Sequence, residues 1–336
     1  MHWKDSPLAK RTRELKGTPL AATMEQMSRF AARQSYRVYE QDLNAESSQR
    51  LAEHQPALEP AQAKVVEGLE AQGYSIVPMT EFFSTANGDL WSRLTAERDR
   101  FIERVEDEMA RRREKEEAKA KKGKVRTKGP GKGDYIRRLL GKDQPPLGGD
   151  DPWLRIGISD RVLDVVNSYF GMWSKLTYVD LWYTPPAPPG VTRVSSQRWH
   201  RDYNDAHLVK IFIYLDEVDE ETGPLDYVPA STPGGEYENE WPWRPVSNDL
   251  YPPQDEFEAR IPKSAQVSLT GPAGSMAFCN TSGFHRGGYV TGSRPRVMAV
   301  YNYSSPASLA ALTLRNFTPE VSRDGLSEQA AFALAD

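Results

Sequence analysis

The chain has 336 residues with a formal net charge of −4 at pH 7, and 38% of its residues are hydrophobic. This composition excludes a wholly disordered chain, and the small net charge gives no general reason to expect a nucleic acid or a membrane surface as partner. The single cysteine, Cys279, excludes an internal disulfide, and because there is neither a secretory hydrophobic region at the start nor an apolar run of the roughly 20 residues that span a bilayer, we expect a cytoplasmic protein.

The first 58 residues are rich in Arg, Gln, Glu and Ala, with a weak helical pattern at about 24–39. We interpret 1–58 as a flexible or helical extension that packs on the body, and a dimerisation arm is the alternative. Pro60 then begins a predicted helix that Gly73 ends as a C-cap. The alternating run at 74–78 is expected to form the first strand of the core.

A long charged helix is predicted from about 87 to 122, with a narrow apolar stripe. The stripe consists of Leu90, Leu94, Phe101, Val105 and Met109. The helix continues into a basic, glycine-rich run at 119–133, which we interpret as a solvated surface loop. A contact with a substrate phosphate is the alternative, and nucleic acid is the least favoured partner because neighbouring acidic residues offset the charge.

The middle of the chain alternates between predicted helices, strands and loops. Residues 158–170 are expected to form a helix with Ser159 as its N-cap, and 175–183 a strand that carries Trp182. The proline-rich run at 185–190 cannot join a central sheet. Residues 234–262 contain several prolines and aromatic residues, and because so much exposed apolar area is unfavourable, we expect them to fold over the β structure as a lid.

The chemistry is predicted to lie in Trp199-His200-Arg201-Asp202. At the end of a strand, His200 and Asp202 point from the same face, about 7 Å apart along the strand. Of the five histidines, two lie in the polar N-terminal region, so His285 is the natural third ligand and His207 its competitor. Two histidines and one carboxylate form a facial triad, which leaves positions of an octahedral ferrous ion open for oxygen chemistry.

A basic residue, Arg296, begins the apolar run at 296–303, which is expected to be a buried strand. A charge at the start of a buried strand needs an anionic partner. A guanidinium grips a carboxylate through two parallel hydrogen bonds, which suits the distal carboxylate of a 2-oxo acid that chelates iron. Arg294 is the rival for this role, but it precedes Pro295 in a turn.

These motifs, in this order, resemble the phytanoyl-CoA dioxygenase-like family of Fe(II)- and 2-oxoglutarate-dependent oxygenases over about 65–305. The matching pieces are residues 197–202, 208–218, 221–225, 228–231, 274–278, His285 and Arg296. The resemblance implies a mainly β, α+β fold with flanking helices, whose core is a double-stranded β-helix of the jelly-roll, cupin-like kind. Periodicity alone predicts only an antiparallel sandwich or barrel with flanking helices.

The resemblance also implies Fe(II), 2-oxoglutarate as cosubstrate and O2 as oxidant. The metal ligands would be His200, Asp202 and His285, and Arg296 would complete the catalytic set. Trp182 would line the 2-oxoglutarate pocket, although an ordinary core tryptophan explains it equally well, and Tyr214 is a weaker candidate for that pocket. The candidates for substrate contact are Arg193, Tyr203, Asn204, Trp241, Trp243, Arg244 and Arg286.

We therefore expect a dioxygenase that hydroxylates a C–H bond of a small-molecule or carrier-linked metabolite and releases succinate and CO2. Asp202 fills the coordination position that related halogenases leave to a halide, so hydroxylation is favoured over halogenation, while desaturation, ring closure and demethylation stay open. A cupin-like metal-dependent hydrolase or isomerase and a non-catalytic barrel that binds a partner are the alternatives. The predicted divisions are the extension 1–58, the oxygenase domain 59–310 with an insert at 87–133 and the lid, and a tail at 311–336. The oligomeric state and the substrate are not predicted.

Overall fold

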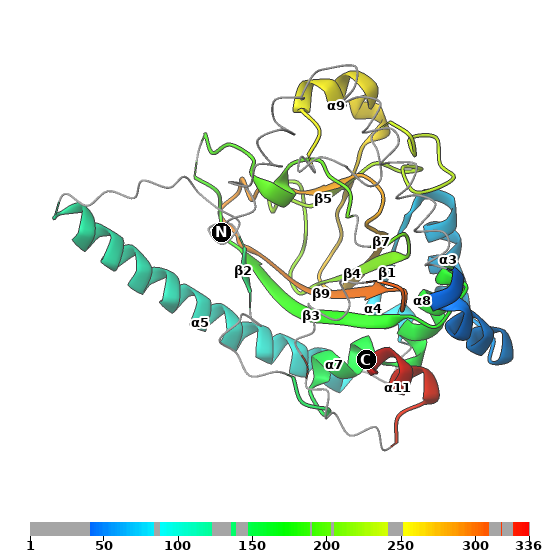
Figure 1. Ribbon diagram of the computed structural model, residues 1–336. Coiled ribbons are helices and arrows are strands. Elements are labelled where there is room, and N and C mark those ends of the chain that lie inside the picture. Colours follow the sequence, from blue (N-terminus) through cyan, green and yellow to red (C-terminus); the bar gives the residue numbers. More distant parts are fainter. Residues whose placement is uncertain are drawn as a thin grey trace, which may run out of the picture.

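The structure, a computed structural model, describes residues 41–83, 88–122, 136–138, 147–188, 190–202, 205–240, 251–308, 317 and 325–335. Its centre consists of two antiparallel sheets, and helices cover the larger sheet on the side away from the smaller one (Figure 1). The helical pattern expected at 24–39 and most of the basic run at 119–133 lie outside the described residues.

The larger sheet has the strand order β1-β7-β4-β9-β3-β2, and the smaller sheet the order β6-β5-β8. The strands of the larger sheet are β1 (Tyr74–Pro78), β2 (Arg137–Arg138), β3 (Lys175–Thr184), β4 (Leu208–Tyr214), β7 (Ser275–Asn280) and β9 (Arg296–Ser304). Those of the smaller sheet are β5 (Leu225–Tyr227), β6 (Val267–Leu269) and β8 (His285–Gly287). After β3 the described chain passes back and forth between the sheets, which is the predicted double-stranded β-helix.

Strand β9 shows how alternation divides the core into two layers. Val297, Ala299 and Tyr301 pack with the helices, whereas Met298 and Val300 belong to a second cluster on the opposite face of the sheet. That second cluster lies between the two sheets and also contains Tyr178, Phe212, Tyr214 and Trp182. Because successive side chains of a strand point to opposite faces, Arg296 is placed on this interior face together with Met298.

The helices on the larger sheet begin and end where local signals predict. Helix α3 (Pro60–Gln72) has its proline in the first turn, and Gly73 ends it at φ 84° with its N–H bonded to Leu69 O, as expected of a C-cap. Ser159 is the N-cap residue of α8 (Asp160–Phe170), but its hydroxyl donates to Ile156 O instead of capping a helix amide. The remaining helices here are α4 (Met79–Phe82), α7 (Pro152–Gly157) and α11 (Glu328–Leu334).

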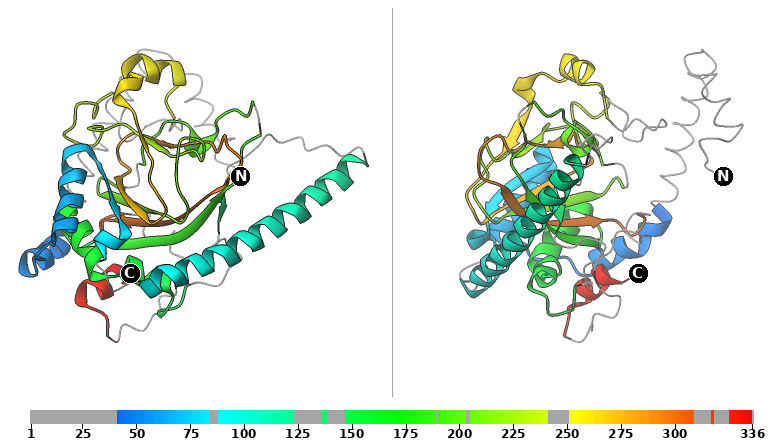
Figure 2. Two further views of the ribbon diagram at one scale, coloured as in Figure 1. Left: turned by 180° about the vertical axis from the view of Figure 1, so that it is seen from behind. Right: turned by 90° about the vertical axis from the view of Figure 1, so that its left-hand side faces the viewer.

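The predicted long charged helix is confirmed as α5 (Gly88–Ala120). Leu94, Phe101 and Val105 of its apolar stripe are buried, while its C-terminal half projects away from the body (Figures 1 and 2). Among the helices in the described part of the chain, none combines the length and apolar character that crossing a membrane requires.

Part of the N-terminal extension contacts the body. Residues 41–53 form a helix, and Asn44 Oδ1 accepts a hydrogen bond from the Ala307 N–H at 3.0 Å. Ser47 O likewise accepts from the Trp173 N–H at 3.1 Å. The domain divisions at 58/59 and 310/311 stay predictions.

Candidate metal centre

Backbone pairing brings the distant metal-ligand candidates together. His200 and His285 exchange N–H···O bonds of 3.0 Å in an antiparallel bridge, which extends the smaller sheet beyond β8. Two residues further on, the Asp202 N–H donates to Thr281 O at 2.8 Å. This register places three potential ligands side by side although His285 is far from the other two in the sequence.

The side chains of His200, Asp202 and His285 converge. Each offers one ligand atom, and these atoms lie within 4.8 Å of one another. The two imidazole rings are 4.2 Å apart between centroids, and His285 Nε2 is 3.7 Å from Asp202 Oδ2. Two imidazoles and one carboxylate in a partly closed site are a donor set that suits a divalent metal such as ferrous iron.

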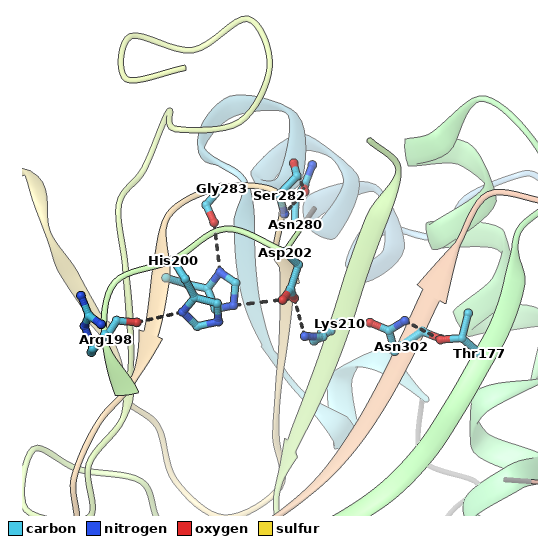
Figure 3. A network of polar contacts seen from close by, with 10 residues as sticks. Thr177, Arg198, His200, Asp202, Lys210, Asn280, Ser282, Gly283 and Asn302 are labelled. Carbon is cyan, nitrogen blue, oxygen red and sulfur yellow. Dashed lines mark hydrogen bonds and ion pairs between the residues drawn. The ribbon is translucent and has the colours of Figure 1, made fainter. Parts of the chain in front are cut away.

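Hydrogen bonds to carbonyls set the tautomer of both imidazoles. His200 Nδ1 is 2.8 Å from Arg198 O, and His285 Nδ1 is 3.0 Å from Gly283 O (Figure 3). Because a carbonyl oxygen only accepts, Nδ1 carries the proton and the lone pair is on Nε2. Such partners orient ligating histidines in metal sites.

Burial and nearby charges favour the ligand forms of these groups. Burial, with His200 beside it, lowers the pKa of His285 to about 3, so the imidazole is neutral at physiological pH. Burial alone would raise the pKa of Asp202, but the charge of Lys210, followed by the histidines, holds it well below its usual range. The Lys210 ammonium contacts the Asp202 carboxylate directly (Figure 3). Asp202 is therefore an anion over the physiological range.

In the segment 199–202, the side chains that alternate with His200 and Asp202 pack against the described part of the predicted lid. Trp199 stacks on Phe257 of helix α9 (Gln254–Arg260) at 4.8 Å between ring centroids. Arg201 donates to four backbone carbonyls, and its guanidinium carbon lies 3.8 Å from the centroid of Phe284. The four carbonyls are those of Ser231, Tyr237, Glu238 and Ser282. Helix α9 lies on the side of the smaller sheet, away from α7 and α11 (Figure 1).

Arg296 is a buried cation on the interior face. It is 4% exposed, and its Nη2 donates to Thr184 Oγ1 at 3.4 Å, while its Nε–H has no hydrogen-bond partner within the described residues. Burial lowers its pKa to about 10, which still leaves the guanidinium charged at neutral pH. A buried guanidinium with a donor to spare fits a carboxylate ligand.

Tyr214 and Trp182 share the interior cluster with Met298. The Tyr214 hydroxyl donates to Leu269 O at 2.7 Å, and Trp182 Nε1 donates to Asp180 Oδ2 at 3.2 Å. Both residues therefore lie on the interior face of the larger sheet, where the 2-oxoglutarate pocket is predicted. Their polar atoms donate hydrogen bonds to other protein groups.

The other described residues that the sequence proposed for cosubstrate, substrate or metal binding have partners away from the triad. Arg294 is half exposed and pairs with Asp219 at 2.6 Å and Glu217 at 3.6 Å. Arg286 alternates with His285, pairs with Asp226 at 2.8 Å and lies over Trp199. Arg193 donates to Gln197 O and Gly287 O, and His207 contacts Phe170.

Five predicted substrate contacts lie outside the described residues: Tyr203, Asn204, Trp241, Trp243 and Arg244. From the same lid, Tyr251 places its ring 5.5 Å from that of His200, between centroids. Lys210 and Tyr251 were not among the predicted site residues. A lysine inside the apolar run at 208–214 is the sequence signal that marks Lys210.

The fold and the site define the class of Fe(II)- and 2-oxoglutarate-dependent oxygenases. The sequence profile of the phytanoyl-CoA dioxygenase (PhyH) family matches residues 63–298, and the chain belongs to this family. Ferrous iron and 2-oxoglutarate are accordingly the cofactor and cosubstrate, with O2 as oxidant, and the converging side chains of His200, Asp202 and His285 are a donor set that fits this metal. The predicted family membership is confirmed.

The chain is also similar to an L-proline trans-4-hydroxylase from Streptomyces griseoviridis, at 28% identity over 153 residues. The matched stretch is 38% of this chain and 57% of the relative, so the chain spans little more than half of that relative.

Two crystal structures show a similar fold. The epimerase SnoN, in complex with Fe3+, alpha-ketoglutarate and nogalamycin RO, has 15% identity and a TM-score of 0.49, covering 80% of this chain and 93% of SnoN. EctD from S. alaskensis, with 2-oxoglutarate and 5-hydroxyectoine, has 14% identity and a TM-score of 0.48, covering 75% of this chain and 79% of EctD. At these identities the likeness concerns the fold alone.

Proposed function

We propose that this oxygenase hydroxylates a C–H bond of a small molecule and releases succinate and CO2. The observation that carries the proposal is the placement of the His200–Asp202–His285 triad and of the buried Arg296 within one double-stranded β-helix. A cytoplasmic location stays a prediction from the sequence.

Each residue has a distinct role in this proposal. His200, Asp202 and His285 would hold the metal through two Nε2 atoms and one carboxylate oxygen. Arg296 would receive the distal carboxylate of 2-oxoglutarate, which would satisfy its unpaired Nε–H. Bound there, iron and the cosubstrate supply the oxidising power for the substrate C–H bond, while the protein orients the reactants and excludes water.

Hydroxylation is the favoured outcome for two reasons. The carboxylate of Asp202 would fill the coordination position at the metal that a halogenase leaves to a halide. The similarity to an L-proline trans-4-hydroxylase, although it covers 57% of that relative, also points to hydroxylation of a small amino acid. L-Proline and related imino and amino acids therefore head the list of candidate substrates.

The test is a screen of purified protein with Fe(II), ascorbate, 2-oxoglutarate and O2. We expect one class of small molecule to stimulate succinate formation and to gain one oxygen atom, measured by NMR and mass spectrometry. His200→Ala should abolish both signals, whereas His54→Ala, which changes an exposed histidine against Trp173, should leave both unchanged.

Other results would contradict the proposal in distinguishable ways. Turnover with no need for 2-oxoglutarate and O2 would indicate the metal-dependent hydrolase or isomerase. Substrate-stimulated succinate without oxygen in the product would indicate desaturation, ring closure or another oxidation in place of hydroxylation. Partner binding that survives His200→Ala, with no turnover in the screen, would indicate a non-catalytic barrel.

A further inference from the structure

A lysine without a place in the proposed chemistry lies beside the metal triad. Lys210 is the third residue of β4, and its neighbours Val209 and Ile211 are fully or almost fully buried. Its side chain is 15% exposed, and its ammonium contacts the carboxylate of Asp202. In register it lies between Cys279 of β7 and Asn302 of β9, on the interior face of the larger sheet.

A second ion pair lies close to the first. Arg138 of the edge strand β2 contacts the carboxylate of Asp180, a residue with no exposed surface, and lies 5.8 Å from the centroid of the Tyr178 ring. The charges of Lys210 and Asp202, and then of Arg138 and Asp180, act on the Tyr178 phenol. We call Lys210, Asp180, Tyr178 and Asn302, together with Arg138, whose side chain is 47% exposed at the edge of the sheet, the polar cluster.

The charges of this cluster balance only while the Asp202 carboxylate pairs with the Lys210 ammonium and with no other cation. Without metal, two cations face two carboxylates. When Asp202 serves as a metal ligand, its charge is shared with a divalent cation, and Lys210 then lies across that carboxylate from a second positive charge. Arg138 and Asp180 still compensate each other, so the cluster carries one uncompensated ammonium. A largely buried ammonium in that position is unfavourable unless an anion approaches it.

We propose that Lys210 anchors an anion subsite beside the metal triad, and that the subsite receives one carboxylate of the substrate. The substrate class is then a small carboxylic acid, including amino and imino acids. This inference rests on the proposed function. Asn302 faces Lys210 across the strand pair, and its amide nitrogen donates to Thr177 Oγ1 (Figure 3). 2-Oxoglutarate also brings carboxylates to the metal, so the experiment has to distinguish a substrate carboxylate from a cosubstrate carboxylate at Lys210.

The experiment compares wild type with Lys210→Met, which removes the charge at similar length, and Lys210→Arg, which keeps it. Lys175→Met is the matched control, because Lys175 is also a buried lysine in the larger sheet but bonds Phe332 O. Each protein is loaded with Zn(II) to prevent turnover, and thermal melting confirms that it is folded. 2-Oxoglutarate is titrated first, and acetate or its uncharged analogue acetamide is then titrated by ligand-detected NMR.

We expect wild type, Lys210→Arg and Lys175→Met to bind acetate in preference to acetamide. Lys210→Met should lose at least about tenfold of the acetate affinity, since a charge-assisted hydrogen bond is lost, and should bind 2-oxoglutarate as wild type does. If Lys210→Met instead loses 2-oxoglutarate affinity by that factor, the carboxylate at Lys210 belongs to the cosubstrate. Unchanged affinities for both probes, or an acetate affinity that Lys210→Met retains, would overturn the subsite.

The two proposals fail separately. If wild type with metal does not bind 2-oxoglutarate, the proposed function fails, and acetate can still be titrated into the metal-loaded protein to test Lys210. If the screen identifies a substrate that has no anionic group, the hydroxylase stands and the substrate carboxylate at Lys210 is refuted.

Discussion

The guanidinium of Arg201 lies 3.8 Å above the ring of Phe284, which links the two chain segments that carry the metal-ligand candidates. Arg201 stands between His200 and Asp202, and Phe284 directly precedes His285. Because side chains alternate along a strand, both residues lie behind the metal site and not within it. Their contact, together with the four carbonyls that Arg201 bonds, fixes how the two segments lie against each other.

Replacing Arg201 with methionine is expected to weaken metal binding without touching a ligand. Four carbonyls, two of them in buried hydrogen bonds and two in partly buried ones, lose their donor, so we expect a loss of about 2 to 4 kcal/mol in the free energy of unfolding. Metal affinity should fall by roughly ten- to a hundredfold, as is typical when the groups that orient ligands are removed. Calorimetric titration with Mn(II) and urea denaturation measure the two effects.

Arg161→Met is the control for Arg201, because Arg161 also donates to a backbone carbonyl, that of Phe82 at 2.7 Å, but lies on helix α8. It should lose stability and keep its metal affinity. If Arg201→Met unfolds, Arg201→Lys provides a milder change. A folded Arg201 variant with the Mn(II) affinity of wild type would show that this arginine serves folding alone.

Arg296→Met is expected to stabilise the protein while removing its response to 2-oxoglutarate. The buried guanidinium has an unpaired Nε–H and a pKa lowered to about 10, so charging it costs folding free energy below that pH. Removing it should add about 1 to 3 kcal/mol at pH 7. Melting temperatures with and without 2-oxoglutarate, in the presence of Zn(II), test this: wild type should gain stability and the variant should not.

The lowered pKa of Arg296 also predicts how the stability difference between Arg296→Met and wild type depends on pH. A base whose folded-state pKa is lowered carries its full penalty below the folded pKa, and the penalty disappears as the pH rises from about 10 toward the unfolded value. The stability advantage of Arg296→Met should therefore be constant from pH 6 to about pH 9 and shrink above about pH 10. An advantage that grows with pH would contradict the assignment.

Asp202 and Lys210 are expected to be coupled in metal-free protein. Asp202→Asn leaves the Lys210 ammonium without its counter-charge and should cost about 1 to 3 kcal/mol, discounted for partial exposure of the pair. Adding Lys210→Met should restore part of that loss. Urea unfolding of both single variants and the double variant in chelator gives the coupling free energy, and strictly additive losses would show that the contact contributes nothing.

Phe257→Ala is expected to loosen the described part of the lid. Phe257 is 3% exposed and packs between Trp199 and Phe284, so truncation should cost about 3 kcal/mol. Amides of α9 should then exchange hydrogen faster, while those of β9 on the larger sheet stay protected. Equal acceleration in α9 and β9 would indicate global destabilisation and no separate lid.

Much of the local structure follows from the sequence because it depends on neighbouring residues. The C-cap at Gly73, the stripe of α5 and the alternation in β3 and β9 all reflect contacts within a few residues. The motif around His200 and Asp202, with Arg296 at the start of an apolar run, likewise carries its chemistry in residue type and spacing. These features carry the resemblance from which the family and its cofactors are predicted.

What the tertiary structure decided is which charged groups meet. From sequence, Arg294 and Arg296 are rivals, and only the packing shows that one pairs with Asp219 and Glu217 at the surface while the other is buried on the interior face. The partnership of Lys210 with Asp202, and of Arg201 with Phe284, arises where strands distant in the chain pair in register. Local spacing determines the face on which a side chain lies, but long-range pairing determines what that side chain faces. This is the physical reason that the sequence indicates the three candidate ligands but not the residues that support them.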